Sequence, residues 1–245
     1  MRRVRRFLST VALATAILLP TGDTLVGYYR LASASMQYIV PTEDVLSASN
    51  SVVGIDTPTG RGSATYIGNG YFISAHHVVA GSEHRQVLVR DWHLGVEYNG
   101  VCVVWDEDQD LVVIHTQDAV LTPPATVSWS DPAVGDRVHG VGFGVSYQDN
   151  KAGCERRLWS GIVTEYVENI GGKAPNCIQS TNPAIQGDSG GALFNDKGEL
   201  IGVIHATDFV HCYSIRNACI HKLLRKLENG IEQEKEGAGR TDSEG

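Results

Sequence analysis

The stretch AIQGDSGGALF (Ala184–Phe194) places one serine, Ser189, between an aspartate and two glycines. A serine becomes a nucleophile only when the chain also supplies a base, an acid that orients the base, and N–H donors for the developing oxyanion. Glycine-rich turns also carry serines that have no chemical role. The prediction for Ser189 therefore depends on whether the rest of the chain offers those three parts.

The composition and the spacing of short apolar runs predict an all-β protein. Of the 245 residues, 42% are apolar and 20% are charged, as in ordinary globular proteins. Runs rich in Val, Ile and Thr alternate with turn residues, including many of the 27 glycines. One series of runs occupies residues 48–122 and a second occupies 125–214, with Pro123 and Pro124 between them. With an amphipathic helix at 215–229, the pattern predicts two small barrels and a C-terminal helix.

Residues 1–34 are typical of a signal peptide. Arginine-rich residues precede the mostly apolar Phe7–Leu19, which as a helix would span only about 20 Å and fall short of a bilayer core. An N-terminal membrane anchor is the alternative, and either one predicts a secreted, periplasmic or membrane-anchored protein outside the cytoplasm. We expect a loose leader at 35–47 and a disordered acidic tail at 230–245. The net charge of −8, with no basic stripe after the first residues, argues against a nucleic-acid partner.

The chain has five cysteines: Cys102, Cys154, Cys177, Cys212 and Cys219. Export permits disulfides, but an odd number leaves at least one thiol. Cys102 lies in the apolar run GVCVVW and is expected to be a buried thiol, so the other four are disulfide candidates with no assigned pairing. The stretch HCYSIRNACIH (211–221) offers two histidines and two cysteines as metal-ligand types. Because it lacks a CxxC pair, we favour a disulfide or thiols over a metal, and we expect no cofactor.

The candidate base lies in GYFISAHHVVAG, where His76 and His77 directly follow an apolar strand. A histidine at the end of a strand can project into a cleft. This pattern resembles the trypsin-like serine peptidases, and the HtrA (Do-like) branch in particular. In that family a Ser or Thr lies three residues before the catalytic histidine and a hydrophobic residue follows it. Ser74 and Val78 meet these conditions for His77, so the resemblance implies that His77 is the base and His76 a neighbouring surface group.

The acid that orients the base is expected at the start of another strand. The stretch DEDQDLVVIHT contains three aspartates, and only Asp110 directly precedes the apolar run. Its DLVV is similar to the Asp-Leu-Ala-Val-like element of the family, with Val112 in place of the small residue. The resemblance therefore implies that Asp110 is the orienting acid. Asp106 and Asp108 are expected to be solvated loop charges.

The resemblance covers about residues 48–228 and implies both a fold and an activity. The order His77, Asp110, Ser189 is that of chymotrypsin-like enzymes and not of subtilisins or α/β-hydrolases. It implies two six-stranded antiparallel β-barrels and a serine endopeptidase that cuts protein or peptide substrates through an acyl-enzyme intermediate. Gly187 can adopt backbone angles closed to other residues, and the resemblance implies that its N–H and that of Ser189 form the oxyanion hole.

Two features depart from the HtrA pattern. That branch usually has an asparagine before the nucleophile, whereas this chain has Asp188, whose partner could be an amine, an arginine or backbone donors. An HtrA protease also carries a peptide-binding PDZ module after its catalytic domain. Only 228–245 follows Leu227 here, so we expect no such module. The sequence leaves the oligomeric state open.

The substrate pocket is expected around Pro183, Ala184, His205 and Ala206. Pro183 lies about six residues before Ser189 and is not acidic, so a preference for Lys or Arg at the cleaved bond is not indicated. GVIHAT is similar to the segment of glutamyl endopeptidases and viral 3C-like proteases in which a histidine reads Glu or Gln, which would place His205 in the pocket wall. The alternative is a satisfied histidine at a strand end. A virus- or phage-type processing protease and a non-cutting peptide-binding homologue are the other functions considered.

Overall fold

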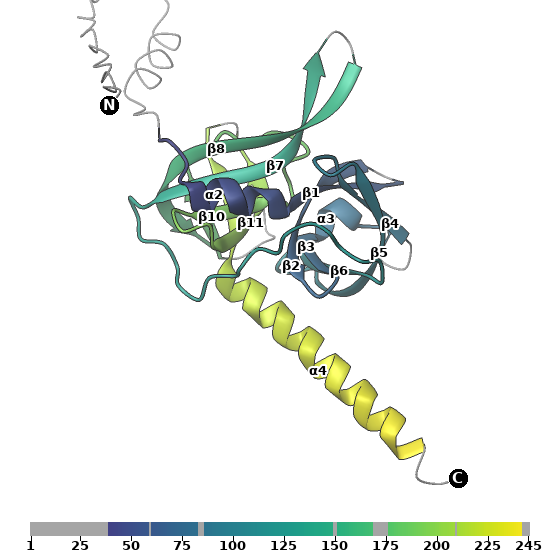
Figure 1. The fold of residues 1–245 in the computed structure, drawn as a ribbon. Coiled ribbons are helices and arrows are strands. Elements are labelled where there is room, and N and C mark those ends of the chain that lie inside the picture. Colours follow the sequence, from purple (N-terminus) through teal and green to yellow (C-terminus); the bar gives the residue numbers. More distant parts are fainter. Residues whose placement is uncertain are drawn as a thin grey trace, which may run out of the picture. The chain divides into compact units, whose positions relative to one another are not determined.

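The computed structural model describes residues 39–58, 60–82, 86–148, 151–168, 176–208 and 210–241. Within these residues, twelve strands close into two six-stranded antiparallel barrels, and helix α4 (Asn217–Thr241) follows them (Figure 1). This result confirms the predicted fold class. The predicted signal peptide or anchor at 1–34 lies outside the described residues. None of the described helices is long and apolar enough to span a membrane.

The first barrel has the strand order β1-β2-β3-β6-β5-β4. Its strands are β1 (Val52–Thr57), β2 (Gly60–Gly68), β3 (Tyr71–Ala75), β4 (Gln86–Asp91), β5 (Val96–Asp106) and β6 (Leu111–Thr116). Buried and exposed residues alternate through most of β5, as expected for a strand with one face on a core. Strands β3 and β6 are buried on both faces, because Phe72 and Ile114 point into this barrel's core while Ile73 and Val113 pack in a cluster shared with the second barrel.

The second barrel has the strand order β10-β11-β12-β9-β8-β7. Its strands are β7 (Arg137–Gln148), β8 (Lys151–Val167), β9 (Cys177–Ser180), β10 (Ala192–Asn195), β11 (Leu200–Thr207) and β12 (Cys212–Arg216). A cluster of apolar side chains fills its interior: Val138, Val163, Ile178, Leu193 and Ile201. Strands β7 and β8 form a long hairpin that pairs without a register shift (Figure 1).

A shared apolar cluster joins the two barrels and helix α4. Leu111 and Val113 reach it from the first barrel, and Ala192 reaches it from β10. Leu111 directly follows Asp110, and Ala192 lies three residues after Ser189. Since closely packed interiors tolerate little displacement, this cluster fixes the strand ends that carry the candidate acid and nucleophile.

Helix α4 is longer than the sequence predicts. Ile215 and Arg216 complete β12, and the helix then runs past Gly230 to Thr241, so the predicted disordered tail is wrong as far as Thr241. Cys219, Ile220 and Leu223 are buried in the shared cluster at the spacing of one helix face, which anchors the first turns. A glycine within a helix costs only about 1 kcal/mol relative to alanine, and the Glu, Gln and Lys residues that follow Gly230 favour helix.

The predicted loose leader also contains structure. Residues Glu43–Ala48 form helix α2, and a short 3₁₀ turn, η1 (Ser49–Ser51), follows it. Thr42 caps the helix, because its hydroxyl accepts a hydrogen bond from Val45 N–H at 3.2 Å and donates one to Asp196 O at 2.8 Å. With Val45 fully buried, the helix is attached to the β10–β11 turn of the second barrel. The prediction that this segment is loose is therefore wrong from Glu43 onward.

Three of the four disulfide candidates are thiols: Cys177, Cys212 and Cys219. Cys177 pairs with Ile215 and Cys212 with Ser180, so the two cysteines lie three residues apart along neighbouring strands. That offset separates their Cα atoms by about 10 Å, beyond the reach of a disulfide. Burial raises the pKa of the Cys177 and Cys212 thiols to about 12. The disulfide expected among these residues is therefore not formed, and the Cys154 side chain lies outside the described part of the structure.

Candidate active site

His77 lies where β3 turns into the short helix α3 (His76–Val79). The N–H of His76 donates to the carbonyl of Asp110 at 2.9 Å, which ties this turn to the loop before β6. The His77 side chain is 46% exposed, whereas His76 is only 8% exposed and its ring stacks against Trp105. The prediction that His76 is a surface group is wrong, because its ring packs against the first barrel.

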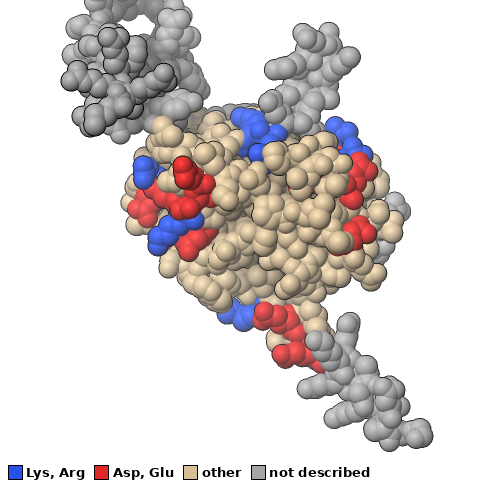
Figure 2. Space-filling model, viewed as in Figure 1, with Lys and Arg blue, Asp and Glu red and all other residues tan. Residues whose placement is uncertain are grey.

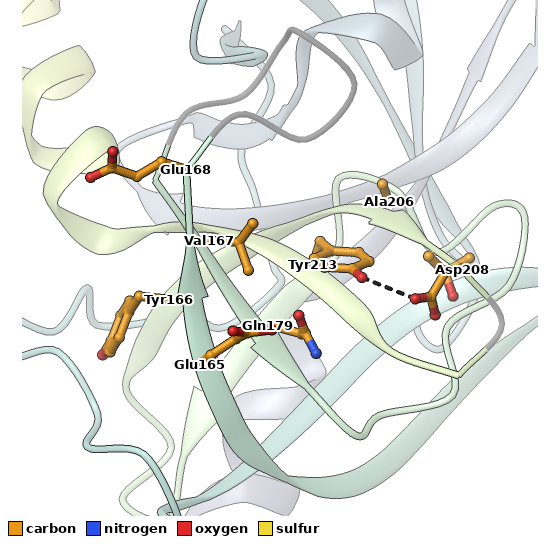
Figure 3. A pocket seen from close by; sticks show the side chains of 9 residues that line it. Glu165, Tyr166, Val167, Glu168, Gln179, Ala206, Asp208 and Tyr213 are labelled. Atoms are coloured by element: carbon orange, nitrogen blue, oxygen red, sulfur yellow. Dashed lines mark hydrogen bonds between the residues drawn. The ribbon is translucent and has the colours of Figure 1, made fainter.

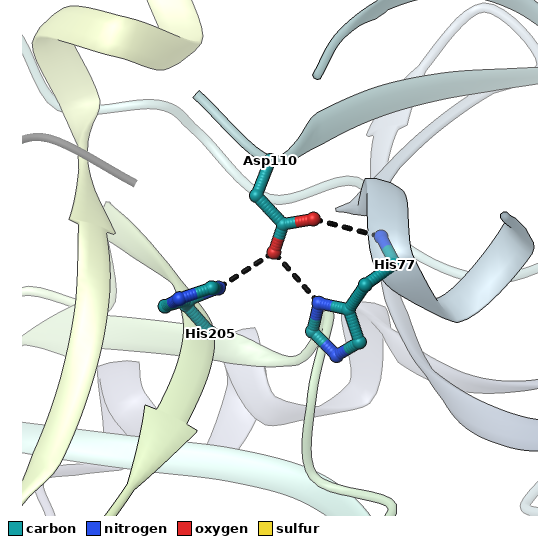
Figure 4. Close-up of side chains that lie close together, drawn as sticks. All are labelled: His77, Asp110 and His205. Carbon is teal, nitrogen blue, oxygen red and sulfur yellow. Dashed lines mark hydrogen bonds and ion pairs between the residues drawn. The ribbon is translucent and has the colours of Figure 1, made fainter. Parts of the chain in front are cut away.

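Asp110 makes three short hydrogen bonds at the entrance of β6 (Figure 4). Its Oδ1 accepts the backbone N–H of His77 at 2.7 Å, and its Oδ2 lies 2.7 Å from His77 Nδ1. The same Oδ2 lies 2.6 Å from His205 Nδ1. Asp110 adopts a φ of 50°, a left-handed conformation that Asp tolerates better than most residues. The structure thus brings the predicted acid and the predicted base into direct contact.

These contacts determine the charge of Asp110. Burial alone would raise its pKa, but hydrogen bonds from His205 and His77 outweigh burial and hold the pKa of Asp110 well below its ordinary value. Asp110 is therefore a carboxylate throughout the neutral range. A carboxylate on Nδ1 selects the tautomer in which Nδ1 carries the proton and Nε2 can accept one.

His205 points to Asp110 and not into a substrate pocket. A register shift between Ile204 and Ala206 interrupts the pairing of β11 with β12 at His205. Such a bulge redirects the side chain at the irregular position, and the His205 imidazole bonds to Asp110 instead of lining a pocket wall. This contact with Asp110 disfavours a role of His205 in reading a substrate Glu or Gln, which stays a prediction to be tested. Its alternative, a satisfied histidine at a strand end, fits the observed geometry.

Ser189 lies in the turn before β10. Its Oγ donates a long hydrogen bond of 3.4 Å to the carbonyl of His205, and among the described residues no hydrogen bond joins it to His77. Gly187 has a φ of 95°, the conformation that favours glycine. Neither the N–H of Gly187 nor that of Ser189 has an acceptor in the described part of the chain. A Cβ at Gly190 would lie 2.0 Å from Ser63 O, so the turn needs glycine there.

Two serines of the first barrel hold this turn, and neither was predicted from the sequence to do so. Ser63 Oγ donates to Gly187 O at 2.8 Å, and Ser63 N–H donates to Ser189 O at 2.8 Å. Ser74 Oγ in turn donates to Ser63 O at 2.7 Å. The turn of the second barrel is therefore fixed by β2 and β3 of the first. The sequence pointed to Ser74 only as the family motif residue three positions before His77 and gave no sign of its hydrogen bond to Ser63.

The trypsin-like peptidase domain family matches residues 62–203, which include all three candidate catalytic residues. The chain belongs to this family. It is 31% identical to a probable periplasmic serine protease, do/HhoA-like, of Haemophilus influenzae over 59% of this chain and 30% of that protein. It is 28% identical to the serine protease Do-like HtrA of Bacillus subtilis over 65% of this chain and 36% of that protein. The chain thus spans about a third of these curated relatives.

Solved structures show the same trypsin-like fold. The serine endoprotease from Yersinia pestis has a TM-score of 0.62 at 26% identity, with 77% of this chain and 68% of that chain covered. The inactive form of Rv3671c from M. tuberculosis has a TM-score of 0.63 at 19% identity, with 78% of this chain and 96% of that chain covered. The second likeness, at this low identity, shows the fold alone.

In this trypsin-like domain the partner of Asp188 is an arginine. The fully buried Oδ2 accepts hydrogen bonds from Ile185 N–H at 2.8 Å and from Arg157 Nη1 on β8 at 3.0 Å. Burial raises the pKa of Asp188 to about 6 despite the opposing effects of Ile185 and Arg157. An arginine was one of three kinds of partner left open by the sequence, which does not identify Arg157 because the contact joins residues on different elements.

Replacing Asp188 with Asn is expected to flatten the pH dependence of stability. The folded protein binds the Asp188 proton more tightly than the unfolded chain, so its free energy of unfolding falls as pH rises from the ordinary value of 3.8 through about 6. This difference corresponds to about 3 kcal/mol, and Asp188→Asn removes it while keeping an acceptor for Ile185 and Arg157. Denaturant titrations at pH 4 and pH 7 measure it. Equal pH dependence in the two proteins would contradict the raised pKa.

The remaining predicted pocket residues have different surroundings and do not line one common pocket among the described residues. Pro183 is exposed, and its carbonyl accepts a long hydrogen bond of 3.4 Å from Arg157. Ala184 is buried in a cluster with Trp159, Ile204 and Cys212. Ala206 borders a pocket with a volume of about 420 Å³ on the outer surface of the second barrel (Figure 3). None of the residues lining that pocket belongs to the triad.

One group of side chains among the described residues could hold a metal ion. It is formed by His77, Asp110 and His205, whose donor atoms lie within 4.8 Å of one another. The hydrogen bonds from both imidazoles to Asp110 account for this convergence without a metal. The other histidines and cysteines considered as ligands diverge, since Cys219 bonds to Gln109 and His221 bonds to the carbonyl of Ser128.

Proposed function

We propose that this chain is a serine endopeptidase that hydrolyses peptide bonds through Ser189, His77 and Asp110. Ser189 Oγ attacks the substrate carbonyl while His77 Nε2 takes the hydroxyl proton and gives it to the leaving amine, so that the C–N bond breaks and an acyl-enzyme ester remains. Water, deprotonated by His77, then attacks this ester, which releases the carboxylic acid and restores the Ser189 hydroxyl, while Asp110 holds the imidazole in both steps. The N–H groups of Gly187 and Ser189 stabilise the oxyanion of each tetrahedral intermediate. The observation that supports this proposal most directly is the buried Asp110 carboxylate, with its Oδ2 2.7 Å from His77 Nδ1.

The nucleophile must rotate before it reacts. Ser189 Oγ must leave the His205 carbonyl, and its 3.4 Å hydrogen bond there is weak enough to exchange for one to His77. Catalytic hydrogen bonds are often long in a protein without substrate and tighten in the Michaelis complex. The non-cutting homologue is disfavoured because every chemical group of the reaction is present. A virus- or phage-type processing protease is also less favoured, because the main argument for it was a substrate-binding role of His205, and His205 instead bonds to Asp110.

Export and a polypeptide substrate are part of the proposal. Several relatives are named as periplasmic serine proteases or endoproteases. Residues 1–34 would direct the export or retain the chain as an anchor. On the face drawn in Figure 2, the Lys and Arg side chains of the described residues form small separate groups, most of them beside Asp or Glu, and no continuous basic patch. This distribution is unfavourable for a nucleic-acid partner.

A fluorophosphonate probe tests the proposed activity, because such probes react only with an activated serine. We expect the folded protein to be labelled at Ser189, as read by mass spectrometry of its peptides. Ser189→Ala and heat-denatured protein serve as controls and should not be labelled. Labelling that persists in Ser189→Ala, or a folded wild-type protein that is never labelled, would contradict the assignment.

A further inference from the structure

The outer surface of the second barrel carries a pocket built from four strands (Figure 3). Glu165 on β8, Gln179 on β9, Tyr213 on β12 and Ala206 on β11 are successive register partners across the sheet. The remaining lining residues flank this row: Tyr166, Val167, Glu168, Thr207 and Asp208. A pocket that rests on paired strands keeps its shape better than one made of loops.

The charge of this pocket is negative. Glu165, Glu168 and Asp208 line it, and none of its nine lining residues is Lys, Arg or His. Asp208 accepts a hydrogen bond from Tyr213 Oη at 2.9 Å, which holds the carboxylate at the pocket wall (Figure 3). Two basic groups among the described residues border the pocket: His211 Nδ1 lies 3.1 Å from Asp208 Oδ2, and Arg216 lies over the Tyr166 ring. Carboxylates grouped in this way favour a cationic ligand.

The side chain of Gln179 is a second, independent indication that this pocket can bind a ligand. Its residue is only 7% exposed and lines the pocket, yet no hydrogen bond to its side-chain amide occurs within the described residues. Its amide is not among the fully buried groups without a partner, so it faces the open pocket, where water or a ligand can satisfy it. Its carbonyl oxygen can accept from a cation, and its NH₂ can donate to a peptide carbonyl.

We propose that this pocket binds a lysine or arginine side chain of a polypeptide substrate, an inference that rests on the proposed peptidase function. The cationic head would donate to Glu165 and to the Gln179 carbonyl on the neighbouring strand, and the aliphatic stem would lie along Val167. Asp208, on the other side of Tyr213, would add to the negative potential of the pocket without contacting the head. Tyr166 contributes less, because Arg216 already lies 4.7 Å from the centre of its ring.

The position of the pocket along β11 favours a polypeptide over a free small cation. Ala206 directly follows His205, whose carbonyl receives the Ser189 hydroxyl at 3.4 Å. One residue of strand advances about 3.3 Å, so the pocket begins only a few ångströms beyond the nucleophile. A chain held in the cleft can therefore place a side chain there while a neighbouring peptide bond is cut. The pocket would bind a substrate residue that does not flank the cleaved bond. A preference for Lys or Arg in this pocket is therefore compatible with a non-basic residue next to the cleaved bond.

Matched peptides test this proposal. A fluorogenic peptide that the protein cleaves is varied at one position at a time, with Lys, the uncharged norleucine or Glu. At one position we expect Lys to raise kcat/KM roughly tenfold over norleucine, with Glu lower still, and salt to reduce the difference. The double variant Glu165→Gln, Asp208→Asn should bring the Lys-to-norleucine ratio close to one. Glu228→Gln, which removes an exposed charge from helix α4, should leave that ratio as in the wild type.

Binding to Ser189→Ala separates this proposal from the proposed activity. Fluorescence anisotropy with the same labelled peptides should show tighter binding of the Lys peptide, and the double pocket substitution should abolish the difference. If the wild-type protein cleaves nothing but Ser189→Ala still prefers Lys through these residues, the activity fails and the pocket stands. If Lys and norleucine peptides bind and react alike at every position, or if the pocket substitutions have no effect, the proposal is overturned.

Discussion

Ser189→Ala and His77→Ala should each lower kcat by about 10⁶-fold, and combining them should lower it little further. Each substitution alone removes the proton transfer that makes the serine nucleophilic, so the second has nothing left to remove. The residual rate should come from substrate binding and the N–H groups of Gly187 and Ser189. Steady-state kinetics on a cleaved peptide, with thermal unfolding to check the fold, measures both effects.

His76→Ala is the matched control for His77→Ala. The two histidines are adjacent, but His76 is buried against Trp105 while the His77 ring contacts Asp110. His76→Ala should lower the unfolding temperature and change kcat by less than tenfold. If His76→Ala abolishes turnover and His77→Ala does not, the assignment of the base is wrong.

The candidate triad could be named from the sequence because local patterns, together with the resemblance to trypsin-like peptidases, single out each member, and its catalytic role stays a prediction. His77 and Asp110 lie at strand ends marked by long apolar runs, and Ser189 lies in a glycine-rich turn. A strand end can be located from the residues around it. The family match across residues 62–203 and the two barrels agree with these positions.

The sequence could not predict contacts that depend on register between strands. The orientation of His205 depends on a bulge at one residue of β11, and a strand without that bulge would turn the side chain to the other face. Arg157 reaches Asp188 from β8, and no local pattern around either residue names the other. The sequence could not decide between a disulfide and thiols for the same reason, because the three-residue offset between Cys177 and Cys212 becomes visible only once β9 and β12 are paired.

Asp110→Asn should lower kcat by about 10⁴-fold with little loss of folded structure. An Asn in place of Asp110 would present its NH₂ to His77 Nδ1, so the imidazole would carry its proton on Nε2 and could not accept one from Ser189. Steady-state kinetics and circular dichroism of the purified variant test this. Retention of more than a tenth of wild-type kcat would contradict the role assigned to Asp110.

Substitution of His205 should lower kcat by less than substitution of Asp110, because His205 acts through its hydrogen bond to the Asp110 carboxylate. His205→Ala removes one of three hydrogen bonds to Asp110, and we expect kcat to fall about tenfold with KM nearly unchanged. His205→Asn should recover most of the loss, because an Asn NH₂ can occupy nearly the position of Nδ1 and donate to Oδ2. If His205 only positions Asp110, its substitution should slow the cleavage of all substrates equally. If His205 contacts the substrate, the substitution should slow the cleavage of some substrates more than others. Cleavage of Glu, Gln and Ala peptides by His205→Ala therefore decides between these roles, and a loss confined to Glu and Gln would return His205 to the pocket wall.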